Sequence, residues 1–217
     1  MMPEVMLGKR GSNVYLILDE KNVLIDAGAD ERELTSFLMS LGPRRIDLVL
    51  LTHVHLDHIL ALPKILEYLD QSDYPIDIAV HEAEIDHIND KDYTAAYLFG
   101  INDLPEVKPT ISLKDGNQID IGNNSLEIIH TPGHSIGSIC IYDKKNKNLF
   151  SGDTVFSDGN FGRTDLFGGS SSDLISSIER LTRLDVENIY PGHMSPVLGD
   201  GNKSIGYSLK YAKMLLF

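Results

Sequence analysis

The densest group of chemically active side chains in the sequence is the segment Thr52-His53-Val54-His55-Leu56-Asp57-His58. In an extended backbone His53 and His55 point to the same side, so both imidazoles can reach one metal ion. Asp57 and His58 stand where the chain turns toward a helix, so they can instead serve a second ion a few ångströms away. An isolated histidine is often a core or surface residue, but this cluster indicates a metal site.

Three more potential ligands follow predicted strands and stand beside glycines. They are His134 after residues 126–129, Asp153 after residues 148–150, and His193 after residues 188–190. Functional sites usually form where loops from neighbouring strand ends converge on a rigid support. Each of these signals is weak alone, but their common placement, together with the first segment, predicts one shared site.

The elements that must position these residues alternate between strands and helices in both halves of the chain. Short apolar runs predict strands at residues 13–18, 23–26, 47–51, 76–80, 126–129, 138–142, 148–151 and 188–190. Helical spacing of apolar residues predicts helices at 30–41, 60–69, 172–184 and 203–216, the first with Asp30 as N-cap and Gly42-Pro43 as stop signal. We therefore expect two sheets covered by helices, in a single domain over residues 1–217. The glycine- and serine-rich residues 157–172 are expected to form an active-site loop.

The composition excludes several classes of protein. The chain has 19 Lys and Arg against 32 Asp and Glu, a formal charge of −13, which argues against partners such as nucleic acid or an anionic membrane surface. The lone Cys140 excludes an intramolecular disulfide and a thiolate metal cluster. There is no signal-peptide pattern, and the apolar runs are far shorter than the roughly 20 residues of a membrane helix. A cytoplasmic location is expected.

The order His-x-His-x-Asp-His, then His, Asp and His, resembles the metallo-β-lactamase superfamily, and the resemblance covers the whole chain. It implies an α/β fold, an αββα four-layer sandwich with a two-metal site between the sheets. It implies one metal held by His53, His55 and His134, a second held by Asp57, His58 and His193, and Asp153 as the bridge between them. His81, His87 and His130 are left outside this ligand set.

The implied donors are imidazole nitrogens and carboxylate oxygens. This set suits zinc, with ligand distances of about 2.0–2.2 Å, although iron and manganese accept the same donors. Two divalent ions roughly 3.5–4 Å apart can hold a bridging hydroxide and polarise a carbonyl oxygen. Asp57 has a second candidate role as the catalytic group that orients the attacking water or accepts its proton.

Two neighbouring segments narrow the resemblance. Gly152-Asp153-Thr154-Val155-Phe156, followed by Gly162-Arg163-Thr164-Asp165, resembles glyoxalase II-like hydrolases of the short type without a C-terminal helical domain. This resemblance implies that a metal-bound hydroxide cleaves a thioester, either hydroxyacyl-glutathione or a related acyl-thiol. Arg163 stands where glyoxalase II enzymes carry a lysine that grips a carboxylate of glutathione, so it is the candidate substrate-binding residue. The alternative is that Arg163 pairs with Asp165 and braces the loop.

Three other functions stay open. Persulfide dioxygenases share the ordered ligands, with a single iron, and usually continue Gly-Arg-Thr-Asp with Phe-Gln-Gln-Gly, where this chain has Leu166-Phe167-Gly168-Gly169. Lactonases share the ligands as well. A non-catalytic metal-binding module predicts the loss of a ligand, and none is lost. Because two divalent ions outweigh the charge of two ligand carboxylates, even an acidic protein can bind a small anionic thioester at such a site.

Overall fold

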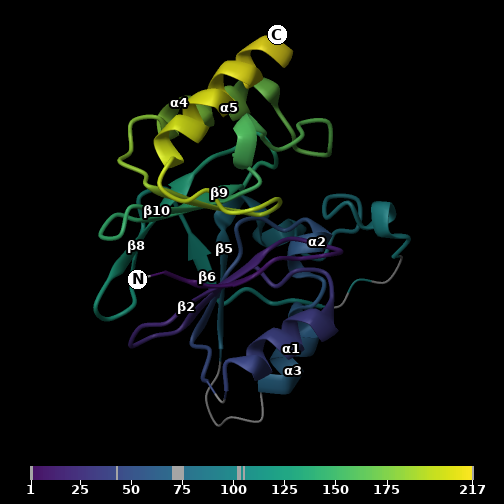
Figure 1. Cartoon of the computed structure of the whole chain (residues 1–217). Coiled ribbons are helices and arrows are strands. Elements are labelled where there is room, and N and C mark those ends of the chain that lie inside the picture. The colour runs from purple at the N-terminus through teal and green to yellow at the C-terminus, as the bar shows by residue number, and fades with distance from the viewer. Residues whose placement is uncertain (1, 43, 70–75, 102–103, 105, 217) are drawn as a thin grey trace.

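The two halves of the chain each build one β-sheet, and the sheets face each other between helices (Figure 1). The computed structural model describes residues 2–42, 44–69, 76–101, 104 and 106–216. The first sheet contains, in spatial order, β1 (Glu4–Met6), β2 (Val14–Ile17), β3 (Val23–Ile25), β4 (Leu48–Leu50), β5 (Asp77–His81) and β6 (Ile111–Leu113). The second contains β11 (Asn188–Pro191), β10 (Asn148–Gly152), β9 (Ile139–Asp143), β8 (Ser125–His130) and β7 (Gln118–Asp120).

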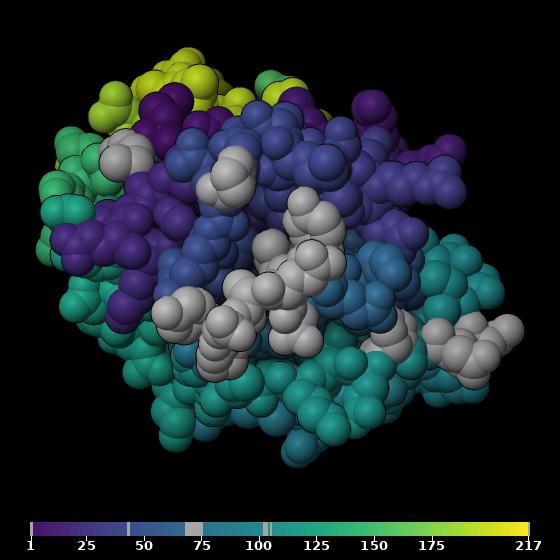
Figure 2. Space-filling model, turned by 90° about the horizontal axis from the view of Figure 1, so that it is seen from below, coloured from purple at the N-terminus to yellow at the C-terminus, as the bar shows by residue number. Residues whose placement is uncertain are grey.

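Helices cover the outer face of each sheet. The helices are α1 (Glu31–Ser40), α2 (Leu56–Ile59), α3 (Leu62–Leu69), α4 (Ser171–Leu181) and α5 (Gly201–Leu215), with 3-10 turns η1 (Glu82–His87), η2 (Ala96–Phe99) and η3 (Ser157–Gly159). Helices α1 and α3 lie below the first sheet in Figure 1, and α4 and α5 lie above the second. Seen from below, purple and blue N-terminal segments occupy the upper and middle part of the face, and teal segments from the middle of the chain lie along its lower part (Figure 2). The layers are those of the predicted αββα sandwich, and the α/β fold is confirmed.

Three separate cores hold these layers together. The core between the sheets includes Tyr15, Ile25, Leu50, Ile128, Ile141 and Phe150. The core under α1 and α3 includes Leu16, Leu24, Leu34, Val49, Leu62 and Ile65. The core under α4 and α5 includes Cys140, Leu149, Leu174, Ile178, Ile205 and Ala212. Successive strand residues such as Leu24 and Ile25 point to opposite faces and enter different cores, which is why the central strands are apolar throughout.

The predicted elements differ from the observed ones mainly at their ends. The predicted helix over 172–184 ends as α4 at Leu181, because the amides of Arg183 and Leu184 bond to carbonyls three residues back rather than four. The predicted helix over 60–69 begins at Leu62, after the separate turn α2. The short strands β1, β6 and β7 were not predicted. Pro43, part of the predicted stop signal, lies outside the described residues.

No helix within the described ranges is both long enough and apolar enough to cross a membrane.

Candidate metal centre

The segment that carries the first ligands runs between the two sheets. It leaves β4, a strand buried between β3 and β5 in parallel register. The carbonyl of Thr52 accepts a hydrogen bond of 2.9 Å from the amide of Ile139 on β9, which links the segment to the second sheet. His55 then caps α2, whose first turn carries Asp57 and His58. His53 and His55 therefore stand before the helix and Asp57 and His58 on its first turn, as the sequence predicts, although the rings of His53 and His58 also lie close together, with centroids 4.0 Å apart.

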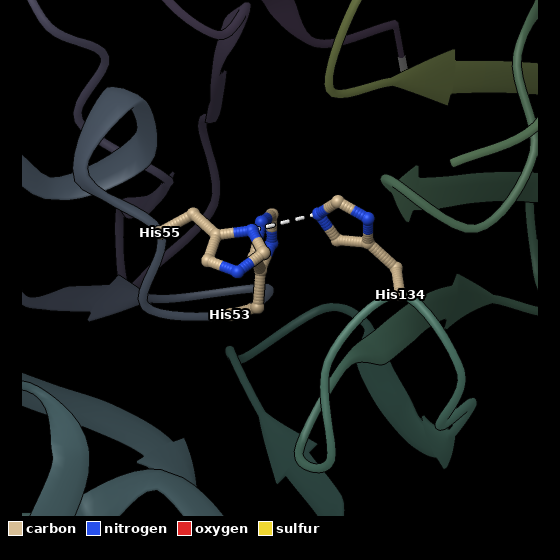
Figure 3. A group of neighbouring side chains, drawn as sticks. All are labelled: His53, His55 and His134. Atoms are coloured by element: carbon tan, nitrogen blue, oxygen red, sulfur yellow. Dashed lines mark hydrogen bonds between the residues drawn. The ribbon is translucent and has the colours of Figure 1, made fainter. Parts of the chain in front are cut away.

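His53, His55 and His134 form one compact group (Figure 3). Their candidate ligand atoms lie within 4.8 Å of one another. His55 Nδ1 and His134 Nε2 are 2.8 Å apart, and Figure 3 shows the His134 ring pointing from the other half of the chain toward the two rings of the β4 segment. The structure thus brings together the three residues that the resemblance assigns to one metal.

Asp57, His58 and His193 form a second group, whose candidate ligand atoms also lie within 4.8 Å of one another. His193 Nε2 is 3.0 Å from Asp57 Oδ2, and His58 Nε2 is 3.9 Å from the same oxygen. These are the residues that the resemblance assigns to the second metal.

Asp153 lies between the two groups. Its Oδ2 is 3.5 Å from His134 Nε2 in the first group and 3.4 Å from His193 Nε2 in the second. Its Oδ1 is 3.3 Å from His58 Nε2. One carboxylate therefore reaches both groups, which is the geometry that a bridging ligand needs.

Three of the histidines are held from behind at one ring nitrogen. His53 Nδ1 is 3.2 Å from the hydroxyl of Thr52, and His134 Nδ1 is 2.8 Å from the carbonyl oxygen of Arg163. His58 Nδ1 is 2.8 Å from Asp26 Oδ2. In each case Nε2 is left to face the site. Such partners orient metal-binding imidazoles and select the tautomer whose free nitrogen can bind an ion.

Sequence reasoning missed Asp26 and Thr52 as supporting residues. The buried Asp26 carboxylate accepts hydrogen bonds from the Thr52 amide and hydroxyl, both at 2.8 Å, in addition to His58. Asp26 directly follows β3. Asp153 and His193 were identified from the sequence by the same kind of position after a strand, so this position could also have indicated Asp26. Its φ of +58° is uncommon for a residue other than glycine, and such conformations concentrate at functional sites.

Several buried polar atoms in this centre have no hydrogen-bond partner among the described residues. They are His53 Nε2, His55 Nε2, His58 Nε2 and Asp153 Oδ1. Leaving such atoms unpaired costs free energy, so buried polar groups are normally satisfied. Nitrogen and carboxylate oxygen donors that converge without partners fit divalent metal ions such as zinc, iron or manganese.

The charges of the centre favour the same interpretation. Burial, followed by neighbouring histidines, lowers the pKa of His53 far below its usual range, and burial lowers the pKa of His55 to about 3. Both rings are therefore neutral near pH 7, the form that binds a metal. Burial also opposes the charge on His193, but Asp153 and Asp57 outweigh it and raise that pKa to about 9. Without a metal, protons on histidine balance the carboxylates.

Arg163 takes the alternative geometry considered from the sequence. Its Nε and a terminal nitrogen each donate to one carboxylate oxygen of Asp165, both at 2.6 Å. Arg163 is also one of the residues that line the cavity above the metal centre. Its backbone carbonyl holds His134, a contribution that does not depend on the type of side chain.

The three remaining histidines lie outside both groups. His81 stacks on His130 with ring centroids 4.0 Å apart, and His87 stacks on Tyr93 at 4.3 Å. Neither pair belongs to a candidate metal group in the part of the chain that the structure describes.

Comparison with known proteins places the chain in a family. The model of the metallo-beta-lactamase superfamily matches residues 7–193. The chain is 34% identical to the probable metallo-hydrolase MJ0888 of Methanocaldococcus jannaschii, over 94% of this chain and 95% of that protein. It is also 34% identical to the acyl-coenzyme A thioesterase MBLAC2 of Homo sapiens, over 85% of this chain and 73% of that protein.

Solved structures share the fold over nearly the full length. The BLEG-1 B3 metallo-beta-lactamase superposes with a TM-score of 0.83 at 27% identity, covering 100% of both chains. TTHA1623 in a di-iron-bound form superposes with a TM-score of 0.75 at 29% identity, covering 97% of both. By its family match, its relatives and its fold, the chain belongs to the metallo-β-lactamase superfamily.

Proposed function

We propose that the protein is a dinuclear metal-dependent hydrolase that cleaves thioesters of the acyl-thiol type. The observation that carries the proposal is the convergence of the predicted ligands into two groups joined by Asp153, with buried nitrogens that lack partners. The relative named as an acyl-coenzyme A thioesterase supports a thioester as the bond that is cleaved.

The metal ions are proposed to be two divalent ions, zinc first, with iron or manganese as alternatives. The donor set accepts all three, and a relative at 29% identity is described in a di-iron-bound form. When bound, such ions supply Lewis acidity toward the acyl oxygen and lower the pKa of water toward 7. His53, His55 and His134 would hold one ion, Asp57, His58 and His193 the other, and Asp153 both.

Asp57 is the candidate catalytic residue. Its carboxylate is partly exposed and lines the cavity, unlike the buried imidazole of His58 beside it. Asp57 Oδ2 contacts His193 Nε2 at 3.0 Å, which holds the carboxylate toward the cavity. In the proposed reaction Asp57 orients the attacking water and accepts its proton, while the water oxygen forms a bond to the acyl carbon and the thiolate leaves.

The thiol carrier is either glutathione, as in hydroxyacyl-glutathione, or a related thiol such as coenzyme A. Both are anionic. Arg163 is the proposed contact for the carrier, because it is one of the residues that line the cavity and the ion pair of its guanidinium with Asp165 is exposed. An exposed ion pair is worth little in stability, so a substrate carboxylate or phosphate can take the place of Asp165 at small cost.

One paired measurement tests the function. The metal content per chain is determined on the purified protein. The same protein is then assayed for hydrolysis of lactoyl-glutathione and acyl-coenzyme A, for hydrolysis of a lactone, and for oxygen uptake with glutathione persulfide. Two metals with thioester cleavage support the proposal. One iron with oxygen uptake would instead identify a persulfide dioxygenase, and preference for the lactone an ester hydrolase. No turnover of any of these substrates by metal-loaded protein would indicate a binding module.

A further inference from the structure

The cavity above the metal centre has a polar floor and apolar walls. Its volume is about 450 Å³, within the usual range for small-molecule sites. The floor consists of metal-centre side chains such as Asp57 and His193. The walls include Leu98, Phe99, Phe156, Phe161, Leu166 and Met194. A substrate whose reacting bond lies at the floor must therefore extend one part along apolar side chains.

One wall is a short 3-10 turn that presents apolar side chains to solvent. Leu98 and Phe99 on η2 are 53% and 40% exposed. In Figure 1, η2 is the short teal helix that projects at the right-hand side, away from the stacked sheets. Adjacent exposed side chains of this size mark a binding surface more often than isolated ones do.

The backbone of this wall is held in place. Ala96 is fully buried, and its amide donates to the carbonyl of Lys91 over 3.0 Å. The carbonyl of Thr94 accepts from the amide of Leu56 at 2.8 Å, which joins the turn to the start of the ligand-bearing helix α2. Ala95 has a φ of +56°, a left-handed conformation that costs free energy in a residue other than glycine. The exposure of Leu98 and Phe99 is thus built into the backbone.

The opposite wall belongs to the segment that follows Asp153. Phe156 bonds through its amide to the carbonyl of Asn160 at 2.9 Å, and Phe161 pairs with Val155 across the same turn. The Phe156 ring centroid is 5.9 Å from that of His193. The apolar side chains of this wall therefore begin next to the candidate ligand His193, and Asn160 and Arg163 are the polar residues that line the cavity among them.

The charges of the residues that line the cavity suit the acyl chain of a thioester better than its anionic thiol carrier. Among the described lining residues outside the candidate metal centre the cationic side chain is Arg163, which is paired with Asp165. Glutathione carries two carboxylates and coenzyme A several phosphates, groups that need cations or many hydrogen-bond donors. An alkyl chain needs neither and gains free energy by leaving water.

We propose that the groove between η2 and residues 156–166 binds the acyl chain of the substrate, so that the protein selects thioesters of apolar acyl groups over acetyl and hydroxyacyl groups. This inference rests on the proposed thioesterase function. The thiol carrier then lies at the mouth of the cavity, near Arg163 and solvent.

The first test is an acyl-chain series on a single carrier, coenzyme A: acetyl, butyryl, hexanoyl and octanoyl, with lactoyl as the hydroxyacyl member. We expect kcat/KM to rise by about fourfold for each methylene that enters the groove, until the groove is filled. Lactoyl should fall near acetyl. If none of the thioesters is cleaved by metal-loaded protein, the proposed function fails. If all are cleaved with the same kcat/KM, the function stands and this inference is wrong.

The second test changes the wall. Leu98→Gln should lower the ratio of the octanoyl to the acetyl kcat/KM by about tenfold, because a half-exposed leucine loses part of its apolar contact. Leu198→Gln is the matched control, since Leu198 is 56% exposed and lies outside the cavity lining. Metal content and circular dichroism check that both variants fold. If Leu98→Gln lowers kcat/KM for the octanoyl and the acetyl thioester by the same factor, the groove does not bind the acyl chain, and the inference is overturned.

Discussion

The carboxylate of Asp26 lies 2.8 Å behind Nδ1 of His58, and both side chains are buried. The same carboxylate accepts two hydrogen bonds from Thr52, the residue before His53. Asp26 therefore positions ligands that belong to both candidate metal groups, although it faces neither group itself. The contact makes the end of β3 part of the metal centre.

Asp26→Ala should weaken metal binding by about 10- to 100-fold, since partners behind metal-binding histidines contribute on that scale. Competition with a chromophoric chelator measures the change. Thr52→Val removes one hydrogen bond to Asp26 and the 3.2 Å contact to His53, but it leaves the shorter Asp26–His58 contact intact, so its effect should be smaller. An Asp26→Ala protein that binds metal as tightly as the wild type would contradict the positioning role.

Asp153→Ala should lose both metals, because this carboxylate reaches His134 in one group and His193 in the other. His134→Ala should lower the occupancy of one ion more than that of the other. Elemental analysis after dialysis against limiting metal gives the metal content per chain. Asp185→Ala, which removes a surface carboxylate paired with Lys147, is the control and should retain full occupancy. Unchanged content in Asp153→Ala would rule out the bridge.

Gly192→Ala should disrupt the metal centre while the remaining fold persists. A Cβ at this position would collide with Asp153 Oδ1 and approach His58 Cε1 to 2.8 Å. The matched control is Gly206→Ala on α5, where a Cβ meets nothing within 4 Å. That control should be neutral or stabilise the fold by about 0.5–1 kcal/mol, as expected when alanine replaces a helical glycine. Metal content and thermal unfolding of the two variants distinguish the outcomes, and full occupancy in Gly192→Ala would contradict the steric argument.

Glu84 supplies a prediction about pH. This buried carboxyl accepts hydrogen bonds from the hydroxyls of Tyr93, at 2.8 Å, and Ser135 and from the amide of Gly137, so it braces the loop that follows His134. Burial raises its pKa above the ordinary 4.5, despite these hydrogen bonds. As pH rises past 4.5 the unfolded chain releases this proton before the folded protein does, so the folded state loses stability until the raised pKa is passed.

Glu84→Gln resembles the neutral form and cannot ionise. The unfolding free energy of the wild type minus that of Glu84→Gln should therefore decrease with rising pH. Urea unfolding of chelator-treated protein from about pH 4 to about pH 8, a range that begins below the ordinary pKa of 4.5, measures this difference, and the other titrating groups cancel in it. A difference that stays constant or increases with pH would show that Glu84 is not held neutral.

The prediction of the fold from sequence was accurate where the pattern is local. Buried strands such as β3 and β4 consist of unbroken apolar runs, and the N-cap Asp30 bonds to the amides of Arg32 and Glu33 as its position predicts. The strands β1, β6 and β7 have three residues each and only partial burial, so no periodicity marks them. Their place depends on a neighbouring strand.

The sequence by itself determined the types of the candidate metal ligands and their placement at strand ends. Those features depend on side-chain chemistry and on backbone periodicity over a few residues. For Arg163 the sequence allowed two roles, a substrate contact or a pair with Asp165, because the spacing is compatible with both.

Only the tertiary structure decided which of these residues contact one another. The contact of His55 with His134, the support of His58 by Asp26, and the reach of Asp153 into both groups join segments that are distant in the chain. The apolar walls above them come from two separate loops. Distances of this kind are set by the packing of two sheets against each other, and that packing depends on all three cores at once rather than on any local pattern.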